Sequence, residues 1–172
     1  MAKIVMQDDC LAPDLQITLN FKGPNPIIAY QKLKRAMRDV WEVEAKDYWE
    51  REFRWDTSGD PREFLVKAYV VKMLDRFSRV IIEIYVHGHQ PSDPSKSGDV
   101  EVRIGGYLKT EFGGKGIIDD ARNPLYKGLL WMYNKYFYWG QRRYYLHEWC
   151  YKKLHKFRDI YQKILNISPP MQ

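Results

Sequence analysis

The sequence predicts a single α+β domain. A curved antiparallel sheet of about five strands would be covered by an amphipathic helix and a long C-terminal helix. Five stretches alternate apolar and polar residues, as strands with one buried face do. Apolar residues at three- and four-residue steps mark a helix after the first strand and more helix at the C-terminal end. With 172 residues, 45% of them hydrophobic, the chain suits one core spanning residues 1–172.

The first strand and helix follow an N-terminal segment, residues 1–12, that we expect to be extended. Asp14–Lys22 alternates cleanly and predicts a strand. Asn25 and Pro26 then form a typical helix start. The helix predicted up to Trp41 carries an apolar stripe of Ala29, Leu33, Ala36, Met37, Val40 and Trp41.

Four consecutive antiparallel strands are predicted in the middle of the chain, at Ala45–Asp56, Phe64–Leu74, Arg79–His87 and Val100–Phe112. Gly88–Gly98, rich in Pro, Ser, Asp and Gly, is expected to be an exposed loop. Strict alternation in the first of these strands would place five side chains on one face: Asp47, Trp49, Arg51, Phe53 and Trp55.

Residues 123–165 predict the C-terminal helical region. Asn123 and Pro124 supply an N-cap and a first helical residue. One straight helix of this length would measure about 60 Å, whereas a compact domain of this size is about 40 Å across. We therefore expect a break near Gly140, since glycine weakens a helix interior.

The same C-terminal region concentrates positive charge. It holds nine Lys or Arg and two acidic residues, a net +7, so the rest of the chain is −1 within a total of +6. It also holds 13 of the 26 aromatic residues. A local cationic surface favours an anionic partner. RNA is one such partner, with phosphates meeting Arg142, Arg143, Lys152, Lys156 and Lys163.

Cysteine usage and hydropathy suggest a cytoplasmic protein. Cys10 and Cys150 are far apart in the chain, and we interpret them as free thiols. The apolar run near the N-terminus meets Asp8 and Asp9 at once, unlike a secretory signal. We find no apolar stretch of the length that a membrane-spanning helix requires.

Motifs for catalysis or metal binding are weak. His87 and His89 could share a zinc ion, because alternate strand residues project to the same side. No third ligand stands at a recognisable spacing, so we interpret them as exposed loop histidines and predict no metal and no cofactor. The sequence offers no nucleophile, base and orienting group in a known arrangement. We therefore predict a binding protein that is not an enzyme.

The order of strand, helix, four strands and long C-terminal helix resembles the helix-grip fold of the START and Bet v 1 superfamily. That resemblance implies an apolar or amphipathic small molecule held between the sheet and the C-terminal helix. In this interpretation Asp47 and Arg51 hold its polar group. The implied apolar lining is Trp49, Phe53, Trp55, Ile82, Ile84, Val102 and Trp149.

Two other interpretations remain open. The chain could be an RNA- or ribosome-associated protein that uses its basic, aromatic C-terminal helix. The aromatic segment that begins the helical region could instead lie at a lipid surface or at the interface of a homo-oligomer.

Overall fold

The computed structural model describes residues 4–93, 95–112 and 124–167. The strands are β1 (Ile4–Asp9), β2 (Ile17–Pro24), β3 (Tyr48–Asp56), β4 (Arg62–Met73), β5 (Ser78–Gln90) and β6 (Ser97–Phe112). Helix α1 (Ile28–Trp41) follows β2, and the short 3₁₀ turn η1 (Ala45–Asp47) precedes β3. The C-terminal helix comprises α2 (Pro124–Tyr133), the π-helical segment η2 (Asn134–Tyr138), α3 (Trp139–Tyr145), the π-helical segment η3 (Leu146–Lys152) and α4 (Lys153–Ile164).

The six strands form one antiparallel sheet, which confirms the predicted fold class. The order is β1-β6-β5-β4-β3, and β2 also pairs with β6. The sixth strand is β1, which comes from the N-terminal segment that we expected only to be extended. It pairs with the end of β6 (Asp9 with Tyr107), and β2 pairs with the start of β6 (Ile17 with Ile104). Gly105 and Gly106 lie between these two pairings, where the chain between β1 and β2 leaves the edge of β6, while both glycines stay in regular register with β5.

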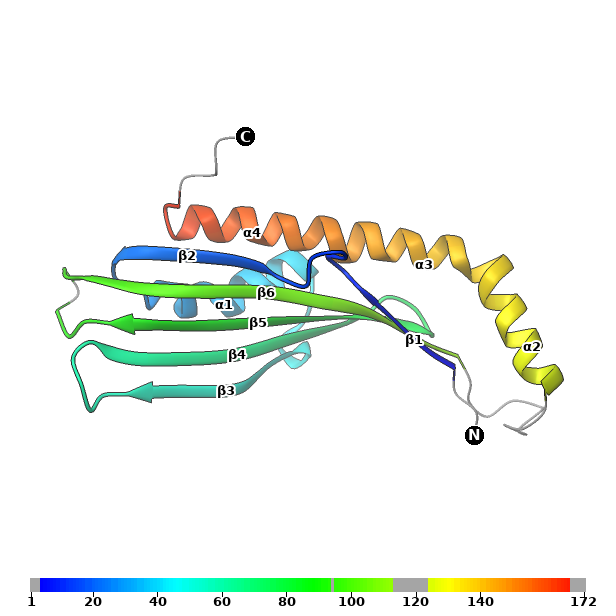
Figure 1. Ribbon diagram of the computed structural model, residues 1–172, viewed down its shortest axis with the longest axis horizontal. Coiled ribbons are helices and arrows are strands. Elements are labelled where there is room, and N and C mark those ends of the chain that lie inside the picture. Colours follow the sequence, from blue (N-terminus) through cyan, green and yellow to red (C-terminus); the bar gives the residue numbers. More distant parts are fainter. Residues whose placement is uncertain (1–3, 94, 113–123, 168–172) are drawn as a thin grey trace.

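Helices α1 and α4 cover one face of the sheet, and no helix of the described residues lies on the other (Figure 1). Alternation along the strands points one set of side chains at the helices, for example Val66, Ala68 and Val70 of β4. The core between sheet and helices includes fully buried Trp41, Phe64, Ile82, Ile104, Leu154, Phe157 and Tyr161. We call the uncovered side of the sheet the open face.

Strand β3 breaks the strict alternation that the sequence suggested. Its register with β4 shifts between Glu50 and Glu52, so Arg51 is an extra residue at a β-bulge. A bulge exchanges the faces on its two sides. Trp49 therefore points to the open face, beside Tyr69, whereas Phe53 and Trp55 point to the helix side. The prediction that the five residues from Asp47 to Trp55 share one face is wrong for this reason.

The C-terminal helix stays helical from Pro124 to Ile164 and changes direction without a loop. Gly140 lies inside α3, and Figure 1 shows the bend between α2 and α3, where η2 lies. π-helical segments are a common cause of such kinks. Asn123, the predicted N-cap, lies outside the described residues. No described helix is long and apolar enough to cross a membrane.

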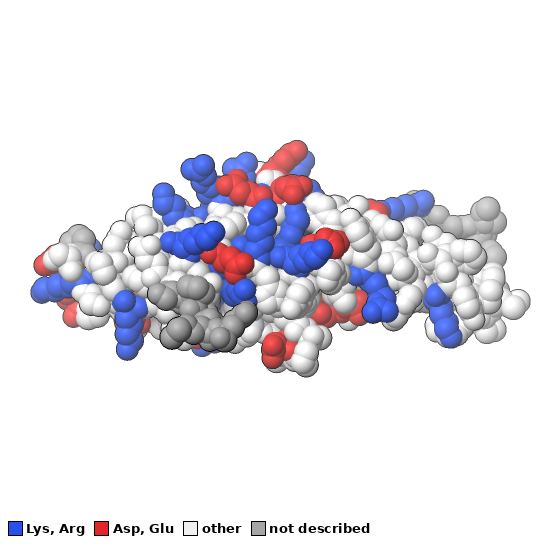
Figure 2. All heavy atoms as spheres, turned by 90° about the horizontal axis from the view of Figure 1, so that it is seen from above, with Lys and Arg blue, Asp and Glu red and all other residues white. Residues whose placement is uncertain are grey.

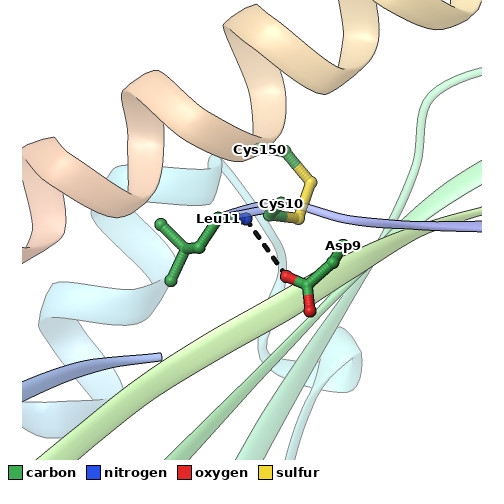
Figure 3. The surroundings of a disulfide bond; sticks show 4 residues. All are labelled: Asp9, Cys10, Leu11 and Cys150. Atoms are coloured by element: carbon green, nitrogen blue, oxygen red, sulfur yellow. Dashed lines mark hydrogen bonds between the residues drawn. A yellow bond between two sulfur atoms is a disulfide. The ribbon is translucent and has the colours of Figure 1, made fainter. Parts of the chain in front are cut away.

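Cys10 and Cys150 form a disulfide bond, so the prediction of free thiols is wrong. Cys10 follows β1, and Cys150 lies in η3, with their Cα atoms 5.1 Å apart. Figure 3 shows Cys150 reaching from the helix to the segment between β1 and β2, where Leu11 N–H donates to Asp9 Oδ1 (3.1 Å). The two cysteines are 140 residues apart in the sequence, and they meet only because the C-terminal helix packs against the sheet.

Candidate ligand groove and neighbouring surfaces

A groove of about 420 Å³ lies on the open face of the sheet. Most of its lining side chains on β4, β5 and β6 alternate with the buried ones and point away from the helices, whereas Ala68 and Ile84, which also border the groove, belong to the buried set. The segment from β1 to β2 forms one wall. The lining residues are Gln7, Asp9, Leu15, Gln16, Arg51, Lys67, Ala68, Tyr69, Glu83, Ile84, Tyr85, Arg103, Gly105, Gly106 and Tyr107.

Tyr85 of β5 is flanked by cations from both neighbouring strands. The Lys67 Nζ atom lies 5.9 Å from the centroid of the Tyr85 ring, and the Arg103 guanidinium carbon lies 5.3 Å from it. Each cation also has an acidic partner, since Lys67 Nζ is 2.7 Å from Glu52 Oε2 and Arg103 Nε is 2.7 Å from Glu101 Oε1. These contacts hold an aromatic and cationic surface in place on rigid strands.

These ion pairs also shift the pKa values of the two carboxylates at the rim of the groove. The hydrogen bond from Lys67, together with the charges of Arg54 and Lys67, lowers the pKa of Glu52. The hydrogen bond from Arg103 likewise lowers the pKa of Glu101. Both carboxylates therefore stay charged and keep the cations at the groove.

The segment between β1 and β2 passes close to β6. A Cβ added at Gly105 would lie 3.4 Å from the backbone oxygen of Leu15, an ordinary van der Waals contact, so the segment passes directly over this part of β6. The Leu15 side chain is largely exposed and stands as an apolar rim beside Gln16. The groove therefore suits an amphipathic molecule with an anionic group. Its apolar part would meet the tyrosine rings and Leu15, and its anionic group would meet Arg51, Lys67 or Arg103.

The structure separates the ligand-lining residues suggested by the sequence. Ile82, Ile84 and Val102 are buried in the core. Phe53 and Trp55 belong to an aromatic row at the helix side, where Phe53 stacks on Tyr30 of α1 with ring centroids 4.9 Å apart. The other positions are η1 for Asp47, the open face for Trp49, the groove for Arg51, and a half-buried place on η3 for Trp149.

Tyr48 and Tyr30 converge on one carboxylate beside that row. The Tyr48 hydroxyl donates to Glu50 Oε1 (3.0 Å), and the Tyr30 hydroxyl donates to Glu50 Oε2 (3.3 Å). Burial, followed by the charge of Glu50, raises the pKa of Tyr48 well above its usual value. These two hydroxyls therefore stay protonated and act as donors that fix α1 against β3.

The first part of the C-terminal helix presents exposed apolar side chains to solvent. We call α2 and η2, residues Pro124–Tyr138, the aromatic segment. Its exposed large side chains are Leu125, Leu129, Trp131, Met132, Tyr133, Tyr136 and Phe137. Lys135 Nζ lies 4.7 Å from the Trp131 ring centroid and 5.8 Å from that of Tyr136. The segment contains no acidic residue.

The cationic residues suggested for RNA binding fall into two groups. Arg142 is buried and pairs with Asp8, which takes it away from any surface partner. Lys152 Nζ lies 2.6 Å from Glu148 Oε1. Arg143, Lys156 and Lys163 are exposed. Figure 2 shows Lys and Arg gathered over the helix layer together with several acidic residues, whereas the end formed by α2 is mostly uncharged.

Glu63, His87 and His89 meet on the open face near the end of β5. Their potential ligand atoms all lie within 4.8 Å of one another. The sequence interpretation missed this cluster because it ended the strand at His87 and treated His89 as part of a loop. The cluster could have been predicted from the register of the β4–β5 hairpin. A turn around Asp75 and Arg76 sets the register that places Glu63 opposite His89.

Comparisons with known proteins add no functional assignment. No family model and no curated protein matches the chain. A Staphylococcus aureus protein of unknown function is similar in structure over 86% of this chain and 96% of its own, at 8% identity and a TM-score of 0.24. An uncharacterised Rhizobium leguminosarum protein is similar over 91% and 99%, at 9% identity and a TM-score of 0.21. Similarities this low support no conclusion about the function of this chain.

Proposed function

We propose that this protein binds an amphipathic small molecule carrying an anionic group, in the groove on the open face. The observation that carries this proposal is the Tyr85 ring held between Lys67 and Arg103 on three adjacent strands. The groove has a volume of about 420 Å³, which lies within the usual range for ligand pockets. The apolar part of the ligand packs on Tyr69, Tyr85 and Tyr107, and its anionic group pairs with Arg51 or Lys67.

A fluorescence titration with 8-anilino-1-naphthalenesulfonate, an amphipathic anion, tests this location. Tyr85→Ala should weaken binding at least about tenfold, which corresponds to about 1.4 kcal/mol. Tyr151→Ala removes an exposed tyrosine on the helix and is the matched control. Dodecylamine, which carries the opposite charge, should compete less well than dodecanoate.

The helix-grip resemblance predicts a different location, between the sheet and the C-terminal helix, and the same titration separates the two. Trp149→Ala alters that interior and leaves the groove intact. If Trp149→Ala abolishes binding and Tyr85→Ala does not, the groove proposal is wrong and the interior site is favoured. Equal binding by all variants would place the probe elsewhere.

A second candidate function is attachment to an anionic lipid surface through the aromatic segment. Trp and Tyr side chains beside Lys and Arg are typical of helices that lie at a membrane interface. Lys127 and Lys135 are exposed, and no acidic residue balances them within the segment. A second copy of this surface would bring like charges together, whereas an anionic lipid surface complements them.

Sedimentation with vesicles tests this second candidate. Vesicles of phosphatidylcholine and phosphatidylglycerol in equal amounts should carry the protein down, and vesicles of phosphatidylcholine alone should carry down less. Replacing Trp131 and Phe137 by Ala should abolish the difference. RNA is the alternative partner. The lipid candidate fails if the protein binds neither kind of vesicle but binds single-stranded RNA. Weaker RNA binding by a Lys156→Glu/Lys163→Glu double variant would then support the RNA alternative.

We further propose that the protein resides in the cytoplasm, as the sequence suggested from hydropathy. Because Cys10 and Cys150 form a disulfide, free thiols no longer support the cytoplasm. Protein disulfides are rare in most cytoplasmic compartments, so this proposal rests on hydropathy alone. Cell fractionation followed by immunoblotting of the untagged protein is a direct test. Recovery of the protein outside the cytoplasmic fraction would overturn this proposal.

A further inference from the structure

Two histidines and one glutamate converge on the open face, outside the groove. His87 Nε2 lies 2.8 Å from Glu63 Oε1, and the His87 and His89 rings meet edge to face with centroids 5.4 Å apart. Glu63 stands directly opposite His89 in the β4–β5 pairing, and His87 is its diagonal neighbour. The paired backbones of two strands therefore hold all three side chains.

Asp99 fixes the orientation of one imidazole. His89 Nδ1 lies 3.1 Å from Asp99 Oδ2, and the two residues are direct neighbours across β5 and β6. A neutral imidazole that donates its Nδ1–H to this carboxylate keeps its Nε2 lone pair for another partner. The same arrangement of carboxylate and histidine is common behind the metal-binding histidines of proteins.

We propose that Glu63, His87 and His89 bind a divalent transition-metal ion of the zinc type, with Asp99 positioning His89. Two imidazole nitrogens and one carboxylate oxygen form a ligand set that suits Zn²⁺, Co²⁺ or Ni²⁺, whereas Mg²⁺ and Ca²⁺ prefer oxygen ligands alone. Ligands of a tetrahedral zinc ion lie about 3.4 Å apart. The potential ligand atoms now lie within 4.8 Å of one another, so binding requires them to adjust by about 1 Å to reach that spacing.

The site leaves room for a further ligand on the metal. The side chains of His87 and His89 are 30% and 37% exposed, and that of Glu63 is 52% exposed. Three protein ligands and an open position are typical of metal ions that bind water or an exogenous ligand. Because the His87 ring centroid is 6.3 Å from that of Tyr85, the metal would lie beside the groove.

Isothermal titration of the full, untagged chain with ZnCl₂ tests the proposal, and the visible spectrum of a Co²⁺ titration reports the ligand set. The wild type should bind one ion. His87→Ala, His89→Ala and Glu63→Gln should each weaken binding by more than about tenfold, and Asp99→Asn by about 10- to 100-fold, as loss of an outer partner does. His147→Ala removes an exposed histidine on the helix and should leave the affinity unchanged.

Thermal unfolding supplies a second readout that does not depend on optical signals of the metal. All five variants replace exposed or half-exposed side chains, so their melting temperatures without metal should match the wild type. Zinc at a fixed concentration should raise the melting temperature of the wild type and of His147→Ala more than that of the other four variants, because stabilisation by an ion that binds the folded state falls with its affinity. Equal zinc affinity of the wild type and the His87→Ala/His89→Ala double variant would overturn the proposal, as would no zinc binding by the wild type.

Discussion

The two ends of the C-terminal helix both carry aromatic side chains, but their surroundings are opposite. In α4, Leu154, Phe157 and Tyr161 are fully buried against α1 and the sheet. In the aromatic segment, Phe137 and Tyr136 are among the most exposed large hydrophobic side chains of the described residues. One continuous helix therefore serves as the cover of the core at one end and as a free surface at the other.

The contrast arises from what each end can pack against. The apolar residues of α4 recur at three- and four-residue steps, and α1 and the sheet receive that stripe. The Trp41 and Phe157 rings lie 5.2 Å apart, and the Tyr161 hydroxyl donates to the backbone oxygen of Ala29. Helix α2 extends away from the sheet (Figure 1), and most of the large side chains of the aromatic segment are exposed on several sides of the helix. Aromatic density alone does not indicate burial.

The joint between the two ends is held by Tyr138. Its hydroxyl donates to Asp75 Oδ2 (2.6 Å), in the turn between β4 and β5, and lies 2.7 Å from Ser78 Oγ, at the start of β5. Its ring packs edge-on against Phe112, with centroids 5.0 Å apart. Tyr138 therefore anchors the helix to the end of the sheet at the position where the helix bends.

The comparison is tested most strongly by the same substitution at each end. Phe157 is 0% exposed and Phe137 is 75% exposed. Phe157→Ala should lower the free energy of unfolding by about 3–5 kcal/mol, because it leaves a cavity in the core. Phe137→Ala should change it by less than about 0.5 kcal/mol. Urea denaturation followed by circular dichroism measures both. Similar losses for the two variants would show that the aromatic segment is packed in solution.

Removal of the disulfide should have the next largest effect. The bond ties η3 to the segment between β1 and β2, so it stabilises the buried end of the helix. Replacing both Cys10 and Cys150 by Ser should lower the free energy of unfolding by about 2–4 kcal/mol. Dithiothreitol should destabilise the wild type and leave the double variant unchanged. Two free thiols in the native, unreduced protein would contradict the disulfide.

Loss of the Asp75 carboxylate should weaken the joint by about 1–2 kcal/mol. Burial raises the pKa of Asp75, but hydrogen bonds from Tyr138 and from the N–H groups of Phe77 and Ser78 outweigh it, so the pKa lies below its usual 3.8. A depressed pKa means that this stabilisation is complete above the unfolded value and is lost as pH falls through the folded value. Wild-type stability should therefore fall more steeply below about pH 4 than that of Asp75→Asn. Parallel pH profiles would exclude this role for Asp75.

Regular periodicity allowed most of the fold to be predicted from the sequence. The α1 stripe, the four central strands and the buried stripe of α4 repeat at the period of their element, and the structure confirms them. Three features depend on single residues or on distant partners. The extra residue at the β3 bulge reverses the face of Trp49, the Cys10–Cys150 bond joins residues 140 positions apart, and β1 forms by pairing with β6.

The candidate sites were harder to predict because they depend on register between strands. Of the nine residues suggested for ligand binding, only Arg51 and Ile84 line the groove. The His87 and His89 pair was recognised, but its third member, Glu63, required the exact pairing of β4 with β5. A one-residue slip would have moved Glu63 to the other face of the sheet.

Replacing one glycine in each part of the helix should have the smallest effect on stability and compares the two parts most locally. Gly128 lies in α2 and Gly140 lies in α3, and a Cβ added at either would meet no atom within 4 Å. Alanine favours a helix interior over glycine by about 0.5–1 kcal/mol. Gly140→Ala, next to the Tyr138 joint, should raise the free energy of global unfolding by that amount. Gly128→Ala should instead slow amide hydrogen exchange within α2 and leave global unfolding unchanged, because α2 lies beyond the Tyr138 joint and can open without the core. An equal gain in global stability from both substitutions would show that the two ends unfold as one unit.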